Sequence, residues 1–173
     1  LLVICSLFYY KNRDVNYRFF TDPKIENIYK SIEFSPLRNR CHYDSYAGEG
    51  VEDACSIGKG ATTWALIGDS HGTEIAYSLG QHLAKDNYSV KSFTHSSCTP
   101  NFGDLAAFSN CRAWTKDVLE YVKNHQSIEN VVLVYRYSAA MFGDNRLTYP
   151  SVRNIVNDDS EEVLESLFEI VKY

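Results

Sequence analysis

The sequence predicts an α/β domain with a parallel sheet covered by helices on both faces. Runs typical of strands occupy 63–67, 89–94 and 130–135. Segments with helical spacing of apolar residues occupy about 73–85, 112–125 and 160–171. Because strands and helices alternate, right-handed crossovers make the strands parallel. The last predicted helix reaches the end of the sequence at Tyr173, and three strands make a thin sheet, so we expect the C-terminal part of the domain to be missing.

Each predicted strand has its own signature. Residues 63–67 form an apolar run that stops at Gly68, and residues 89–94 alternate between polar and apolar side chains. Residues 130–135 are almost continuously apolar, which predicts a strand buried on both faces.

Each predicted helix has an apolar face that should pack on the sheet. The three faces are Ile75, Ala76, Leu79 and Leu83; then Trp114, Val118, Tyr121 and Val122; and finally Val163, Leu164, Leu167, Phe168 and Val171. Ser160 or Asp159 is a suitable N-cap for the last of them.

The chain divides into three parts by composition. Residues 1–10 are apolar but too short to span a bilayer, so we expect the end of a transmembrane helix or a signal-peptide remnant. A first buried strand or helix is the alternative. Residues 11–40 are polar and irregular and form a linking extension, and 41–173 form the domain.

Charge and motifs exclude several functions. The 173 residues carry a formal net charge of -5, which argues against a nucleic-acid partner. The sequence has no glycine-rich nucleotide-binding loop, and its cysteines lack the Cys-x-x-Cys spacing of a structural zinc site. We therefore expect no cofactor and no metal site.

Four of the five cysteines fall into two local pairs, Cys41 with Cys55 and Cys98 with Cys111. Each lies in a segment rich in Ser, Gly, Asn or Pro, so the simplest interpretation is two disulfides that each close a short loop. Such a disulfide contributes about 3 kcal/mol in the chain-entropy model and indicates an oxidising compartment. Free buried thiols are the alternative.

The most reactive-looking position is the corner after the first strand, Gly68-Asp69-Ser70-His71. Gly68 permits a tight bend, and Asp69 is suited to hydrogen-bonding the turn. Ser70 then stands at the start of a helix, where its own N–H and the helix dipole can stabilise an oxyanion. We predict Ser70 to be a nucleophile; the ring of His71 should point away from it.

This corner resembles the first conserved block of SGNH/GDSL hydrolases. The paired cysteines, the Ser97-Cys98-Thr99-Pro100 loop and the strand end Tyr135-Arg136-Tyr137 resemble, more narrowly, the SGNH domain fused to membrane acyltransferase family 3 proteins. The resemblance covers residues 38–150. It implies a flavodoxin-like three-layer α/β/α sandwich and acyl-ester chemistry through Ser70.

The resemblance also implies a cellular setting. Such proteins are bacterial O-acyltransferases of the inner membrane that acetylate a surface polysaccharide, with the SGNH domain in the periplasm. The partners would be a polysaccharide or oligosaccharide acceptor and the membrane acyltransferase domain of the same protein. A carbohydrate acetylesterase or a non-catalytic glycan-binding module, using some of the 13 tyrosines, are the alternatives.

The sequence departs from the family in three respects. The loop after the second predicted strand offers Ser96, Ser97 and Cys98 instead of the Gly that contributes to the oxyanion hole. Arg136 stands near the place of the oxyanion-hole Asn, where it could contact an oxyanion or a sugar, or pair structurally with a carboxylate. The late Asp-x-x-His that supplies the base is lacking. Of the histidines, His95 at the end of the second strand could line the site. We expect the chain as given to be inert alone.

Overall fold

The computed structural model describes residues 23, 33–44, 50–96, 98–100, 109–142 and 160–173. The chain divides into two units, Leu1–Phe34 and Ser35–Tyr173, and all elements discussed below lie in the second. The predicted membrane or signal segment at 1–10 and most of the linker at 11–40 lie outside the described residues. Within the described ranges, no helix combines the length and apolarity needed to cross a membrane.

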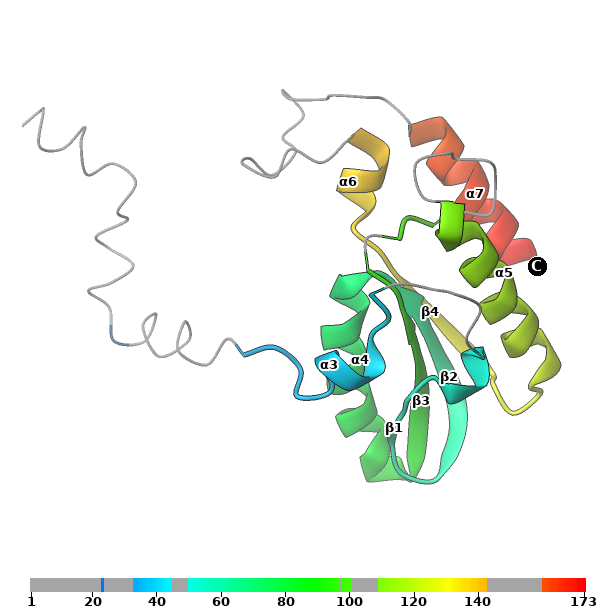
Figure 1. Cartoon of the computed structure of the whole chain (residues 1–173). Coiled ribbons are helices and arrows are strands. Elements are labelled where there is room, and N and C mark those ends of the chain that lie inside the picture. Colours follow the sequence, from blue (N-terminus) through cyan, green and yellow to red (C-terminus); the bar gives the residue numbers. More distant parts are fainter. Residues whose placement is uncertain (1–22, 24–32, 45–49, 97, 101–108, 143–159) are drawn as a thin grey trace, which may run out of the picture. The chain divides into compact units, whose positions relative to one another are not determined.

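From residue 61 to residue 134 the chain of the second unit alternates between strands and helices (Figure 1). The elements of this unit are α3 (Arg38–Cys41), the 3-10 helix η1 (Val51–Asp53), β1 (Ser56–Gly58), β2 (Ala61–Gly68), α4 (Ser70–Leu83), η2 (Ala84–Asp86), β3 (Tyr88–Thr94), α5 (Ser109–Asn124), β4 (Asn130–Val134), α6 (Tyr137–Phe142) and α7 (Ser160–Lys172).

The strands form one sheet in the order β1-β3-β2-β4. β2 pairs in parallel with β3 and β4, as predicted, which confirms an α/β fold. β1 was not predicted: it precedes the first predicted strand, at 63–67, and pairs antiparallel with β3. Only Ile57 of its three residues is buried, so no alternation signals it in the sequence.

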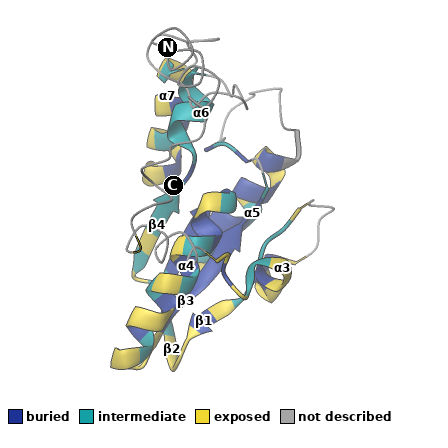
Figure 2. Cartoon of the chain, turned by 90° about the vertical axis from the view of Figure 1, so that its left-hand side faces the viewer, coloured by how far each residue is buried: buried dark blue, intermediate teal, exposed yellow. Residues whose placement is uncertain are grey.

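Helices cover both faces of this sheet (Figures 1 and 2). On one face, Ala76 and Leu83 of α4 pack with Leu66 and Val90. On the opposite face, α5 and α7 cover a larger cluster built from Ile67, Phe93, Trp114, Val118 and Ile170. Burying each large side chain contributes roughly 1.5–3 kcal/mol, so the two clusters account for much of the stability of the sandwich.

Three predictions about burial are wrong. Ile75, on the predicted inner face of α4, is 46% exposed. β4 is not buried on both faces: it is the outer strand of the described sheet, and Val131 is 48% exposed. In α7 the buried residues are Val163, Ser166 and Ile170, whereas three predicted inner residues are exposed, namely Leu164, Phe168 and Val171. The apolar arc of α7 is wider than its contact with the core, so apolarity alone does not identify the packed face.

The structure contains both predicted disulfides. Cys41–Cys55 joins the end of α3 to the segment before β1, and Cys98–Cys111 joins the segment after β3 to the first turn of α5. The Cys41–Cys55 disulfide lies beside β3, since Ser92 donates its N–H to the Cys55 carbonyl at 2.8 Å. Tyr43 also forms a parallel bridge with His95, which places the 42–44 segment beside the end of β3.

Candidate functional site

The predicted corner is the junction of β2 and α4, and Ser70 is the first residue of the helix. A side chain at Gly68 is impossible without rearrangement, since a Cβ there would lie 1.9 Å from the carbonyl oxygen of Val134. Glycine is therefore required by the close approach of β4. Ser70 itself is half-buried.

Asp69 fixes the geometry of this corner. It is 5% exposed, and it is the N-cap of α4: its Oδ1 accepts the N–H of His71 at 2.8 Å. Its Oδ2 accepts the N–H of Arg136 at 2.7 Å, and its own N–H donates to the Val134 carbonyl at 3.1 Å. The prediction that Asp69 bonds the turn is confirmed, and the turn it holds includes the end of β4.

Ser70 lies at a topological switch point. The chain leaves β2 through α4, on one face of the sheet, and it leaves β4 through α6, whose Tyr137 packs against the cluster on the opposite face. The carboxyl ends of β2 and β4 are therefore neighbours from which the chain leaves in opposite directions. Open α/β sheets bind ligands in the crevice outside such strand ends.

Residues 135–137 follow β4 and lie beside the serine corner. Tyr135 is buried, and burial raises the pKa of its hydroxyl group. Tyr137 begins α6 and donates its hydroxyl proton to the Leu133 carbonyl at 3.0 Å; burial raises its pKa too. Arg136 is half-buried between them, and its backbone contact with Asp69 places it next to the serine corner, as its position after the third predicted strand suggested.

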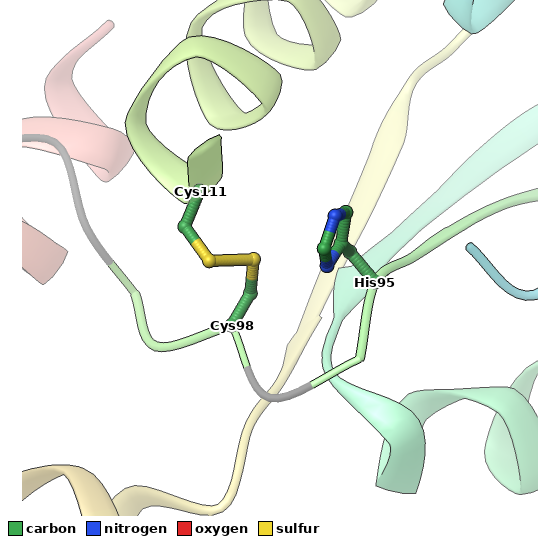
Figure 3. A group of neighbouring side chains, drawn as sticks. All are labelled: His95, Cys98 and Cys111. Carbon is green, nitrogen blue, oxygen red and sulfur yellow. A yellow bond between two sulfur atoms is a disulfide. The ribbon is translucent and has the colours of Figure 1, made fainter. Parts of the chain in front are cut away.

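The two histidines named in the sequence analysis, His71 and His95, both direct their rings to partners other than Ser70. The His71 ring is 49% exposed, with Nδ1 3.2 Å from Asp69 Oδ1, in keeping with the prediction that it is no base for Ser70. The backbone of His95 lies at the sheet edge, where its N–H donates to the Gly68 carbonyl at 3.0 Å. Its ring, however, is buried against Trp114 beside the Cys98–Cys111 disulfide (Figure 3). His95 therefore does not line the site with its ring.

His42 is a residue that the sequence did not single out. Its Nδ1 lies 3.1 Å from Thr94 Oγ1 and 3.2 Å from Thr73 Oγ1, and its Nε2 lies 2.9 Å from Ser96 Oγ. The ring therefore links the first turns of α4 to the end of β3. Burial, followed by the positive charge of Arg38, lowers the pKa of His42 and favours the neutral ring. Only its position next to Cys41 could have hinted at this.

A polar cavity of about 320 Å3 lies beside this ring. Its lining residues are Arg38, Asn39, His42, Asp44 and Ser96. The Arg38 guanidinium group donates to the carbonyl oxygen of Ser70 at 3.3 Å and pairs with Glu74, so the cavity adjoins the serine corner. Such a set of cationic, amide, hydroxyl and carboxylate groups suits a hydroxylated ligand.

The arrangement provides a nucleophile and an oxyanion donor. The N–H groups of His71 and Gly72 are bonded to Asp69, whereas the N–H of Ser70 has no acceptor within the described ranges. All five histidines belong to those ranges, and none forms a hydrogen bond with the Ser70 hydroxyl group there. The site can hold an oxyanion at the start of α4.

A comparison with models of protein families gives one match, described as "SGNH domain (fused to AT3 domains)", over residues 40–171. No curated protein and no solved structure matches the chain.

Proposed function

Because the chain belongs to the family of SGNH domains fused to AT3 domains, we propose that it transfers an acetyl group to a surface polysaccharide through Ser70. The observation that carries this proposal is the position of Ser70, at the first residue of α4 and at the switch point between β2 and β4. Family membership itself supports a hydrolase-like module of an acyltransferase.

In the first step Ser70 Oγ attacks the carbonyl carbon of an acetyl ester or thioester, and its proton passes to a base. The tetrahedral oxyanion accepts the N–H of Ser70 and is stabilised by the helix dipole. Collapse expels the leaving group, which takes the proton from the base, and leaves acetyl-Ser70. In the second step a sugar hydroxyl attacks this ester, so the acetyl group moves to the sugar and Ser70 recovers its proton.

The groups around the corner suit this chemistry. Asp69 is occupied by three hydrogen bonds that fix the turn, so it acts as a positioning residue, not as a base. The backbone N–H of Arg136 donates to that carboxylate, which places the residue next to the corner. We propose that its guanidinium group contacts the oxyanion or the sugar. The polar cavity next to Arg38 has the donors and acceptors that a sugar ring needs.

In this account the acceptor is an oligosaccharide or polysaccharide, and the partner is a membrane acyltransferase domain in the same protein. The domain acts in the periplasm, attached to the bacterial inner membrane. Two disulfides support an oxidising compartment.

The test is O-acetylation of the polysaccharide in cells that produce the complete protein with Ser70→Ala. We expect acetylation to be lost. Ser78→Ala is the matched control, because Ser78 is an exposed serine two turns further along α4, and it should acetylate normally. Unchanged acetylation with Ser70→Ala contradicts the proposal.

Two alternatives give other outcomes. A carbohydrate acetylesterase would release acetate from acetylated glycan in a Ser70-dependent way without acetylating an acceptor. A glycan-binding module, which the polar cavity favours, would bind oligosaccharide equally well with and without the Ser70 hydroxyl group.

A further inference from the structure

The buried ring of His95 faces the Cys98–Cys111 disulfide (Figure 3). One ligand atom from each of the three residues, a ring nitrogen or a sulfur, lies within 4.8 Å of the other two. His95 is 5% exposed, Cys98 2% and Cys111 3%. Three atoms with affinity for metals are thus gathered in the core, on the α5 face of the sheet.

The tautomer of His95 is set by its backbone neighbour. Nδ1 lies 2.9 Å from the carbonyl oxygen of Ser96, and because a carbonyl only accepts, Nδ1 carries the proton. A neutral ring then has its lone pair on Nε2. This atom is buried and has no hydrogen-bond partner among the described residues. Metal-binding histidines have the same arrangement, with one nitrogen on a carbonyl and the other directed at the metal.

We propose that His95, Cys98 and Cys111 bind one Zn²⁺ ion when the disulfide is reduced. A dithiol reductant donates two electrons and two protons, the S–S bond breaks, and two thiols form while the reductant becomes a disulfide. Zn²⁺ then replaces both thiol protons, and Nε2 supplies the third ligand. Two thiolates and an imidazole suit zinc, with a water molecule in the fourth position of a tetrahedron.

The disulfide and the zinc ion would hold the same part of the fold. Cys98 follows β3, and Cys111 lies in the first turn of α5, so either link joins the carboxyl end of β3 to that helix. Zinc in the reduced chain would take the place of the S–S bond. A small-molecule disulfide that accepts two electrons, and is itself reduced to thiols, would form the S–S bond again and release the ion.

The experiment measures zinc bound to the chain in its two redox states. The chain is reduced with dithiothreitol, freed of it by anaerobic desalting, incubated with ZnCl₂ and desalted again. We expect about one zinc per reduced chain, by mass spectrometry of the metal, and none per oxidised chain. If reduction loosens the fold, zinc should restore the circular dichroism spectrum. A reduced chain that neither binds zinc nor refolds with it overturns the proposal.

The second disulfide provides a matched control. The pair Cys41 and Cys55 has no third ligand at comparable distances in the described part of the chain. Cys41→Ser with Cys55→Ser should therefore retain one zinc in the reduced state, and Cys98→Ser with Cys111→Ser should retain none. The opposite pattern overturns the assignment.

His95 separates this site from non-specific binding by thiols. His95→Ala should weaken zinc binding at least tenfold, measured by competition with a chromophoric chelator. His82→Ala, which removes an exposed histidine of α4, should leave the affinity unchanged. Equal affinities of wild type and His95→Ala contradict the proposal.

Discussion

The carboxylate of Asp69 accepts the backbone N–H of Arg136 at 2.7 Å, which joins the N-cap of α4 to the end of β4. Asp69→Ala removes both this bond and the cap. A lost cap costs about 1 kcal/mol, and an unsatisfied N–H adds about 1–3 kcal/mol, so urea unfolding should show a loss of about 2–4 kcal/mol. Asp69→Asn, which keeps one acceptor, should lose less. Asp86→Ala, at an exposed acidic residue, should change stability by under about 0.5 kcal/mol.

Gly68 and Gly72 differ in what a methyl group would meet. At Gly68 it would lie 1.9 Å from the Val134 carbonyl oxygen, which is held in the sheet, so Gly68→Ala should cost about 3 kcal/mol or more. At Gly72 it would meet side-chain methyl groups of the buried Leu66 and Thr94 at 3.0 and 3.1 Å, which need to move by only a few tenths of an ångström. The better helix propensity of alanine partly offsets that crowding, so Gly72→Ala should cost under about 1 kcal/mol. Thermal unfolding compares the two; similar losses contradict this account.

His42 should make stability depend on pH. Its pKa in the folded chain is below the usual value near 6.5, so the unfolded chain binds a proton first. The neutral His42 ring therefore makes its full contribution to the free energy of unfolding above about pH 6.5. That contribution decreases as the pH falls toward the pKa of His42 in the folded chain. His42→Gln should therefore flatten the stability-versus-pH curve below pH 6.5. The exposed His82→Gln should keep the wild-type slope; equal slopes for all three proteins would rule this role out.

Removing the hydroxyl group of Tyr135 and that of Tyr137 should change the free energy of unfolding in opposite directions. The Tyr135 hydroxyl is buried without a partner in the described structure, so Tyr135→Phe should be neutral or stabilising by up to about 1 kcal/mol. Tyr137 bonds the Leu133 carbonyl, so Tyr137→Phe should lose about 1 kcal/mol. Equilibrium unfolding in urea measures both; a larger loss for Tyr135→Phe would show that its hydroxyl group has a partner.

The elements that could be predicted from the sequence are those in which the pattern of apolar residues extends over several turns. Trp114 and Val118 are fully buried on the predicted face of α5, and α4 spans Ser70–Leu83 where a helix over about 73–85 was predicted. The hydrogen bonding of Asp69 to the turn could be predicted because it depends on residues next to Asp69 in the sequence.

Other features depended on neighbours distant in sequence. β1 is three residues long and exists through pairing with β3, and the exposure of Val131 follows from the outer position of β4. The direction of the His95 ring is set by Trp114 and the disulfide. The contacts of His42 involve residues from α4, from the end of β3 and from the segment after α3. Because these residues are far apart in the sequence, no spacing pattern predicts that they meet.

The central claim is that Ser70 is a nucleophile, and covalent labelling tests it most directly. The complete protein is treated with a fluorophosphonate probe, and labelled peptides are identified by mass spectrometry. The account predicts one adduct, on Ser70, in the wild type and in Ser78→Ala, and none in Ser70→Ala. An unlabelled Ser70 in a protein that still acetylates its polysaccharide, or an adduct confined to another residue, would contradict it.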